Sequence, residues 1–447
     1  MRITKLFLGL IGVGAGALLL NCCIPSREAS CPTDHECGAG TVCNLETHHC
    51  ESKSDLMEPP NDPPQPDCTT ESQCSDAKAC VNNKCVVCQL HDDCGSKLCE
   101  PATPPSTNNR CLNANQVYVV DATADSGKCS VADGSVANPF CKLQDALAAM
   151  PYRYAIRLVG SKAFDVEYTG PFDLGKMENR TFRIFGSGPA NPDQGRPVLT
   201  AGAMDTILTI APTSGQTKVI LDGVSILRAN GGVDCKLLSQ ASPPLLEIHR
   251  SSLSGSTFFG LRTSQCVVTV TRSVFSALPY IAFYLDEGTY TVTDNFFTRN
   301  GGDGQANESP LTYHYTRGVF ANNTVVANIG TPIALGGKKS VNCNNLSTPL
   351  QDSIILSDPK AYDSQFTGNC QLANVVVHPS ETYASPGKIP ALPSFTQTEP
   401  TYYALRDDTT NEQCCINKVE SPLSLTDYFG NPRPIGPKAD IGAHEVK

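Results

Sequence analysis

A short motif recurs seven times between residues 219 and 377, and this repeat constrains the fold more than any other feature of the chain. Each copy has an apolar residue, any residue, a polar residue, a small or turn-forming residue, and then two or three mostly apolar residues. The polar position is occupied by Asp222, Arg250, Arg272, Asp294, Asn322, Asp352 and, in the last copy, Ala373. Successive copies are 28, 22, 22, 28, 30 and 21 residues apart. Such a unit cannot bury its apolar face alone, so the copies are expected to stack into a solenoid.

Apolar residues at alternate positions indicate that the repeats are strands, as in Val224 and Ile226 or Val268 and Val270. We therefore predict a parallel β-helix with one coil per repeat and about nine to eleven coils. The apolar positions that flank the motif should form its core: Ile220, Val224, Ile248, Val270, Val274, Val292, Phe296, Phe320, Val325, Ile354 and Val375. Asn295, Asn323 and Asn374 are expected to stack at equivalent corners of the coils.

The first residues have the form of an export signal. Arg2 and Lys5 precede fifteen uncharged, mostly apolar residues at 6–20, too few to span a membrane comfortably. The following Leu19-Leu20-Asn21-Cys22 resembles the lipobox of bacterial lipoproteins. The resemblance implies that residues 1–21 are removed and that Cys22 carries a lipid that anchors the protein to a membrane. An ordinary signal peptide beside an incidental cysteine pair is the alternative.

Cysteine is abundant, with 22 residues in the chain, which excludes a reducing compartment. Twelve of them form three groups of four within residues 22–115: Cys31, Cys37, Cys43, Cys50; Cys68, Cys74, Cys80, Cys85; and Cys88, Cys94, Cys99, Cys111. We predict a stalk of three disulfide-stapled modules, which resemble Dickkopf-type or EGF-like repeats. Each group allows three pairings. Zinc is the weaker alternative, because structural zinc sites favour C-x2-C pairs, and no metal is expected.

Further disulfides are predicted in residues 116–447. Cys129 and Cys141 bracket one loop, whereas Cys235 with Cys266 and Cys343 with Cys370 are each separated by about one coil. The neighbouring Cys414 and Cys415 could pair with each other or separately. Cys23 is the first candidate for an unpaired thiol.

Segments at both ends of residues 116–447 resemble segments of a known fold. The segments "VYVVDATADSG" and "GSVANPFCKLQDALAAM" resemble the opening of right-handed parallel β-helix proteins of the pectin-lyase-like kind. Within them, residues 142–150 predict a short helix that covers the open end of the solenoid. Near the C-terminus, "GNPRP" followed by "DIGAHE" resembles the closing segment of exported bacterial β-helix proteins. The resemblance implies an all-β, right-handed parallel β-helix over residues 116–447. Its N-terminal cap is residues 116–150. Residues 378–447 should wrap over the last coil, with Asp440 and Glu445 meeting backbone groups or Arg433.

Polar and aromatic residues concentrate around residues 280–317 and form the candidate sugar-binding groove. Its members are Asp286, Glu287, Asp294, Arg299, Asp303, Tyr313, His314 and Arg317. Solvated loops between coils are the favoured interpretation of these residues, and the groove is the functional alternative. No catalytic motif is recognised, although polysaccharide lyases of this fold use calcium and an Arg or Lys base, and hydrolases use paired carboxylates.

Two functions are compatible with these observations. The favoured one is a non-catalytic binding or structural protein of the cell surface or outer membrane, with polysaccharide or surface proteins as partners. The other is a polysaccharide lyase or glycosidase, which in the lyase case would need calcium; otherwise no cofactor is expected. A formal net charge of −10 gives no attraction to nucleic acid. We expect a monomer.

Overall fold

The computed structural model describes residues 41–44, 49–52 and 68–446, with gaps at 71–72, 75–76, 89–90, 101–108, 130, 151, 162–164, 176–178, 187–194, 239–241, 302–308, 329–340, 345–347, 358–365 and 397–403. The signal, the lipobox and Cys23 lie outside the described residues. The chain divides into two compact units, Met1–Gln65 and Pro66–Lys447. In the first unit, β1 (Thr41–Asn44) pairs with β2 (His49–Ser52) as an antiparallel hairpin.

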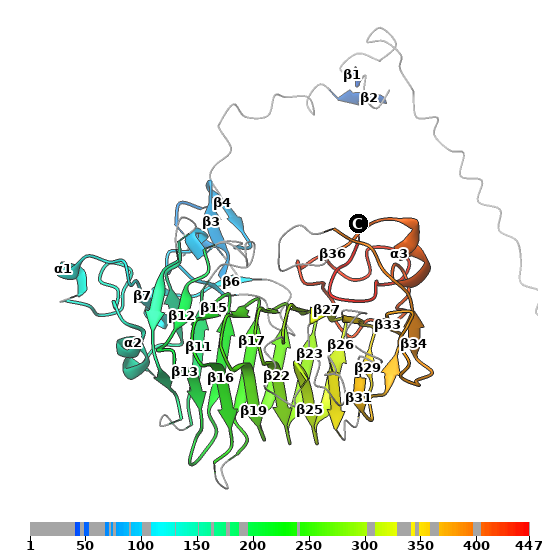
Figure 1. Ribbon diagram of the computed structural model, residues 1–447. Coiled ribbons are helices and arrows are strands. Elements are labelled where there is room, and N and C mark those ends of the chain that lie inside the picture. The colour runs from blue at the N-terminus through cyan, green and yellow to red at the C-terminus, as the bar shows by residue number, and fades with distance from the viewer. Residues whose placement is uncertain are drawn as a thin grey trace, which may run out of the picture. The chain divides into compact units, whose positions relative to one another are not determined.

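Three parallel sheets make up the described body of the second unit (Figure 1). Sheet 1 contains β10 (Phe172–Asp173), β13 (Thr206–Ile210), β16 (Gly231–Lys236), β19 (Phe259–Ser264), β22 (Ile281–Asp286), β25 (Leu311–His314), β28 (Val341–Asn344) and β31 (Phe366–Gly368). Sheet 2 contains β7 (Val117–Val120), β8 (Ala155–Leu158), β11 (Thr181–Phe185), β14 (Lys218–Asp222), β17 (Leu245–His249), β20 (Val267–Thr271), β23 (Thr289–Thr293), β26 (Arg317–Ala321), β29 (Leu350–Gln351) and β32 (Leu372–Ala373). Sheet 3 contains β9 (Glu167–Thr169), β12 (Val198–Thr200), β15 (Ser225–Leu227), β18 (Ser252–Ser254), β21 (Val274–Ser276), β24 (Phe296–Thr298), β27 (Thr324–Asn328), β30 (Ile354–Ser357), β33 (Val375–Val377) and β34 (Lys388–Pro390).

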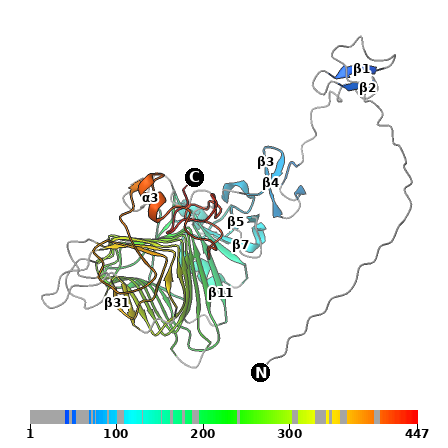
Figure 2. The same ribbon diagram turned by 90° about the vertical axis from the view of Figure 1, so that its right-hand side faces the viewer.

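The chain visits the three sheets in turn, so that β22, β23 and β24 form one coil and β25 begins the next. Each strand pairs in parallel with the strand one coil away, for example Val270 with Val292 and Val292 with Phe320. Figure 2 shows the strands of successive coils lying behind one another around a common interior. The predicted parallel β-helix is therefore confirmed.

The repeated motif marks the corner between sheet 2 and sheet 3. Arg250, Arg272, Asp294, Asn322 and Asp352 all have φ between 47° and 60°, a left-handed conformation that turns the chain sharply. In the first and last copies of the motif, the polar position was predicted one residue too early. Strand register places Gly223 and Asn374 at those corners, instead of Asp222 and Ala373.

A buried polar ladder follows these corners. The backbone N–H of Ser273 donates to Asn295 Oδ1 at 2.8 Å, and that of Asn295 donates to Asn323 Oδ1 at 3.0 Å. Asn295 Nδ2 also donates to Asn323 Oδ1 at 3.0 Å. The predicted stacking is thus confirmed for Asn295 and Asn323. It is wrong for Asn374, which occupies the preceding corner position and donates to Asp352 Oδ1.

The interior of the solenoid is apolar and continuous over the described coils. Seven predicted core residues lie in it: Val224, Ile248, Val270, Val292, Phe320, Val325 and Val375. Four do not. Ile220 is only half-buried on the outer face of sheet 2. Val274, Phe296 and Ile354 are buried in separate clusters with residues of the C-terminal segment, defined here as residues 418–446.

The N-terminal cap forms as predicted. After β7 comes α1 (Ser126–Cys129), and then α2 (Leu143–Ala149) buries Leu143, Ala146 and Leu147 against the solenoid core. Cys129 and Cys141 are joined by a disulfide. Cys235–Cys266 and Cys343–Cys370 also form the predicted pairs, each between neighbouring coils. Cys414 pairs with Cys415.

The second and third cysteine modules belong to the same compact unit as the solenoid. Their disulfides join the first cysteine to the third and the second to the fourth: Cys68–Cys80, Cys74–Cys85, Cys88–Cys99 and Cys94–Cys111. Their regular elements are β3 (Ala79–Val81), β4 (Lys84–Val86), η4 (His91–Asp93), β5 (Cys99–Glu100), β6 (Arg110–Cys111) and, just after them, η5 (Ala114–Gln116). Leu98 of the third module packs with Val119 and Phe185 of sheet 2. This module is therefore seated on the β-helix.

The C-terminal segment lies along the outer side of sheet 3 and crosses several coils. Arg272 Nε donates to the carbonyl of Tyr428 at 2.9 Å, and the N–H of Ala443 donates to Thr324 Oγ1 at 3.0 Å. The expected wrap over the last coil is therefore wrong in its placement. Before this segment, β35 (Phe395–Thr396) pairs with β36 (Ala404–Leu405), and α3 (Thr409–Cys414) follows. No helix among the described residues is long and apolar enough to cross a membrane.

Candidate functional site

A groove of about 610 Å³ runs along the edge where strands of sheet 1 turn into strands of sheet 2. We call it the edge groove. It is lined by Leu237, Pro243, Gln265, Cys266, Val267, Glu287, Gly288, Thr289, Tyr315, Thr316 and Arg317. The lining residues come from the turns of neighbouring coils, so the parallel stacking of the solenoid creates the groove.

Three turns set the geometry of the edge groove. Gln265, Glu287 and Tyr315 occupy equivalent corners of successive coils and have φ of 59°, 47° and 49°. Gln265 Nε2 donates to Glu287 Oε2 at 2.8 Å, and Arg317 Nε donates to Thr289 Oγ1 at 3.3 Å. Tyr315 is 56% exposed. The groove therefore offers an exposed ring beside one carboxylate, one guanidinium and one amide.

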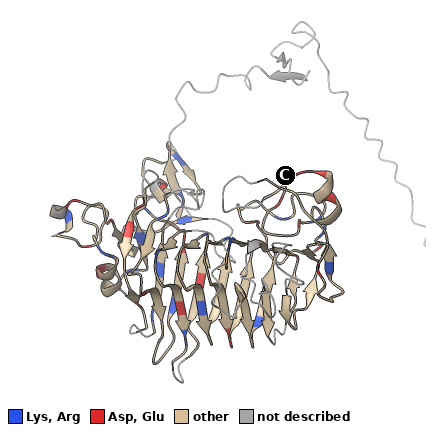
Figure 3. Ribbon diagram, viewed as in Figure 1, with Lys and Arg blue, Asp and Glu red and all other residues tan. Residues whose placement is uncertain are grey.

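A row of polar side chains on sheet 1 continues this surface. Ser264, Asp286 and His314 are in register on neighbouring strands, one residue before the three corners. His314 Nδ1 and Asp286 Oδ1 are 2.8 Å apart, and the His314 ring contacts the Tyr315 ring edge-on at 4.2 Å. Figure 3 shows acidic and basic residues interspersed along the solenoid.

The structure brings together half of the predicted groove residues. Glu287 and Arg317 line the edge groove, with Asp286 and His314 directly beside it. The other predicted members are Tyr313, Arg299, Asp294 and Asp303. Tyr313 points into the solenoid core, Arg299 is exposed at the turn that follows sheet 3, and Asp294 is buried under the C-terminal segment. Asp303 lies outside the described residues.

The positions of Tyr313 and Asp294 outside the edge groove each have a simple cause. Tyr313 and His314 are neighbours on one strand, so their side chains point to opposite faces of the sheet. Asp294 belongs to the corner between sheets 2 and 3, whereas the edge groove follows the corner between sheets 1 and 2. Proximity in sequence therefore did not distinguish between two different edges of the same coil.

A second cleft, which we call the module cleft, was not predicted. It has a volume of about 390 Å³ and lies between the third cysteine module and the outer face of sheet 2. It is lined by Glu100, Tyr154, Arg183, Phe185, Lys218, Ile220, Asp222, Glu247, His249 and Thr269. Polar residues at alternate positions of β14 and β17 were its only sequence signal, because Glu100 and Tyr154 are distant in the chain.

Ion pairs order the floor of the module cleft. Lys218 Nζ lies 2.6 Å from Glu247 Oε1, and His249 Nε2 lies 3.5 Å from Glu247 Oε2. His249 Nδ1 is 2.7 Å from Thr271 Oγ1. Hydrogen bonding to His249 and Lys218 lowers the pKa of Glu247 to about 2. This carboxylate is therefore ionised, and its charge is compensated within the cleft.

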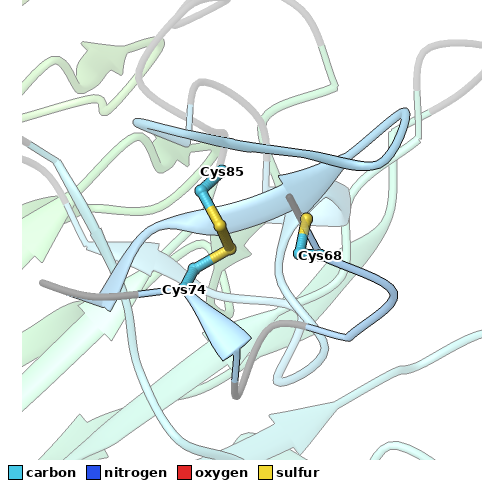
Figure 4. Close-up of side chains that lie close together, drawn as sticks. All are labelled: Cys68, Cys74 and Cys85. Atoms are coloured by element: carbon cyan, nitrogen blue, oxygen red, sulfur yellow. A yellow bond between two sulfur atoms is a disulfide. The ribbon is translucent and has the colours of Figure 1, made fainter. Parts of the chain in front are cut away.

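The described residues contain two groups of cysteines whose sulfur atoms are close enough to share a metal ion. One comprises Cys68, Cys74 and Cys85 (Figure 4), and the other comprises Cys88, Cys94 and Cys111. All six are in disulfides, and zinc requires the free thiolate. These groups therefore do not fit the zinc alternative. The same described residues contain no carboxylate cluster of the kind that calcium requires.

Burial strongly shifts the pKa of Asp294, the predicted groove residue that lies under the C-terminal segment. Desolvation raises the pKa of Asp294 to about 7, against the opposing influence of Arg433 and Arg272. Since the pKa of 3.8 for a solvated Asp is lower, the folded protein binds the proton more tightly than the unfolded chain. The stability that comes from protonation of Asp294 is complete below about pH 4 and is lost as the pH rises through 7. At 1.36 kcal/mol per pKa unit, it amounts to about 4 kcal/mol.

We therefore expect Asp294→Asn to flatten the pH dependence of stability. Between pH 5 and pH 8, the wild-type free energy of unfolding should decrease, and the variant should lose much of that decrease because its amide does not titrate. Denaturant unfolding at both pH values measures the effect. Asp286→Asn is the matched control, because that carboxyl is partly exposed beside His314. Parallel pH profiles for wild type and Asp294→Asn would contradict the assignment.

Comparisons with known proteins add little to these observations. No protein-family model matches the chain, and a search of curated proteins finds no match. Among solved structures, a crystal structure of pectate lyase Pel9A is similar, with 14% identity, a TM-score of 0.44, and coverage of 74% of this chain and 96% of that chain. A likeness at this level carries no functional information. The chain is a parallel β-helix with disulfide-rich N-terminal modules, as its own sheets and disulfides establish.

Proposed function

We propose that this protein is an exported, lipid-anchored surface protein that binds a glycan in the edge groove. The observation that carries the proposal is the exposed ring of Tyr315 beside Glu287, Gln265 and Arg317 in the edge groove. Sugars present apolar C–H faces and peripheral hydroxyl groups. An aromatic face combined with side-chain donors and acceptors is complementary to both.

Two further features support the surface location. The disulfides indicate an oxidising compartment, as is expected for an exported protein. Residues 1–22 supply the signal and the lipid acceptor Cys22 in the sequence prediction. The anchor would present the solenoid to polysaccharides or proteins at the cell surface.

The alternative of a lyase or glycosidase receives no specific support from this groove. Hydrolases that cleave glycosidic bonds use two carboxyl groups on either side of the scissile bond. Among the described residues that line the edge groove, Glu287 is the one carboxylate. It accepts a hydrogen bond from Gln265, whereas neighbouring Asp286 pairs with His314.

Affinity electrophoresis against acidic and neutral polysaccharides tests the proposal. We expect Tyr315→Ala to weaken retardation about 5- to 10-fold, because loss of an aromatic contact costs about 1 kcal/mol. Arg317→Ala should have a similar effect. Arg299→Ala is the control, because this exposed arginine lies on another turn and should leave retardation unchanged.

Two outcomes would contradict the proposal. Unchanged retardation by both groove variants would exclude the edge groove as the glycan site. Release of new reducing ends or unsaturated products from any of these polysaccharides would replace the binding role with a catalytic one.

A further inference from the structure

The charges of the module cleft are almost all compensated within the protein. Glu100 pairs with Arg110 at 2.7 Å, Asp222 with Arg250 at 2.6 Å, and Glu247 with Lys218 at 2.6 Å. Each carboxylate that lines the cleft therefore already has a cation.

Arg183 is the cation of the module cleft that has no acidic partner among the described residues. Its guanidinium lies over the ring of Tyr154, 3.9 Å from the ring centroid. Among the described residues, no carboxylate is within ion-pair distance of Arg183. The side chain is partly exposed on the outer face of sheet 2. The cleft thus contains one cation whose charge no described acid neutralises.

The contact with Tyr154 prepares Arg183 for a particular kind of ligand. A guanidinium held over an aromatic ring by cation–π attraction still has N–H groups around its edge that can donate to a ligand. Two parallel N–H donors in one plane match the two oxygens of a carboxylate. Since the ring restrains the side chain, less conformational entropy is lost when a ligand binds.

We propose that the module cleft binds a carboxylate-bearing ligand through Arg183, at a site separate from the edge groove. One uncompensated cation matches one negative charge, whereas a phosphate carries up to two. The apolar surfaces of Phe185 and Ile220, which also line the cleft, can contact the body of the ligand. The volume of about 390 Å³ is within the range of small-ligand sites.

This ligand would also contact two parts of the chain at once. Glu100 comes from the third cysteine module, whereas Arg183 and Lys218 come from neighbouring strands of sheet 2. A ligand in the cleft should therefore stabilise the seating of the module on the solenoid, because it binds only when both walls are in place.

Calorimetric titration of the full chain with butyrate, butyramide and inorganic phosphate tests the proposal. We expect butyrate to bind at least about tenfold more tightly than the neutral amide and more tightly than phosphate, since hydrogen bonds between charged groups are the stronger ones. Glucuronate and N-acetylalanine then distinguish a sugar acid from a peptide carboxyl terminus as the source of the group.

Variants locate the site. Arg183→Gln should reduce butyrate affinity by about tenfold or more, and Arg183→Lys should be intermediate because it keeps the charge and loses the planar donors. Arg299→Gln, at an exposed arginine that lines neither site, should leave butyrate binding unchanged. Equal binding by wild type and a folded Arg183→Gln protein would overturn the proposal. Equal affinity of wild type for butyrate and butyramide would overturn it without any variant.

Discussion

Replacing Arg433 by glutamine should detach the C-terminal segment from the side of the solenoid. The Arg433 guanidinium is fully buried, 3.4 Å from Asp294 Oδ1 and 3.3 Å from Glu445 Oε2. It also donates to the carbonyls of Asp440 and Gly442 at 2.9 and 2.6 Å. Without it, the buried carboxylate of Glu445 loses its counter-charge, which costs about 3–5 kcal/mol.

Limited proteolysis followed by mass spectrometry measures this effect. We expect cleavage within residues 418–446 at protease concentrations that leave the wild-type protein intact. The strands of sheets 1 and 2 should stay resistant. Arg228→Gln is the control. Arg228 is exposed and pairs with Asp165 at 3.3 Å, so its loss should cost under about 1 kcal/mol. Identical digestion of the two variants would show that the Arg433 contacts do not hold the segment.

Phe297→Ala should open the solenoid itself. The Phe297 ring stacks on Phe275 of the preceding coil at 4.9 Å and lies 6.1 Å from Phe320 of the next coil. Removing a fully buried Phe side chain costs about 3–5 kcal/mol. Because each coil contacts only its neighbours, a defect in a central coil interrupts the column. We expect cleavage between coils near residue 297 and a lower denaturation midpoint.

Phe296→Ala provides the contrast for this experiment. The neighbouring ring points away from the interior and packs edge-on against Tyr428 at 4.8 Å. Its loss should therefore expose the C-terminal segment and leave the coils protected. Phe258→Ala, at a partly exposed ring, controls for the loss of an aromatic side chain. If Phe296→Ala and Phe297→Ala gave the same fragments, the two rings would not serve different interfaces.

Only part of the candidate site could be predicted from the sequence. Glu287, Arg317, Asp286 and His314 were predicted and lie in or beside the edge groove. Tyr315 contributes the exposed ring, although Tyr313 was the residue predicted. Alternation along a strand separates such residues into two faces, but it does not say which face is inside. The module cleft needed two distant segments to come together and had no local signature.

The repeated motif was enough to determine the parallel β-helix, five of its seven corners and the two disulfides between neighbouring coils. The reason is physical: a periodic apolar unit can bury its face only on a copy of itself, so local pattern and global architecture agree. Its register was misread at Asp222 and Ala373, where the motif is weakest. The burial of Phe296 and Asp294 depends on contacts with the C-terminal segment, more than a hundred residues away in the sequence. Only the tertiary structure decided that an outward-facing Phe and a corner Asp would be buried, because burial by a non-local partner leaves no trace in the period of the repeat.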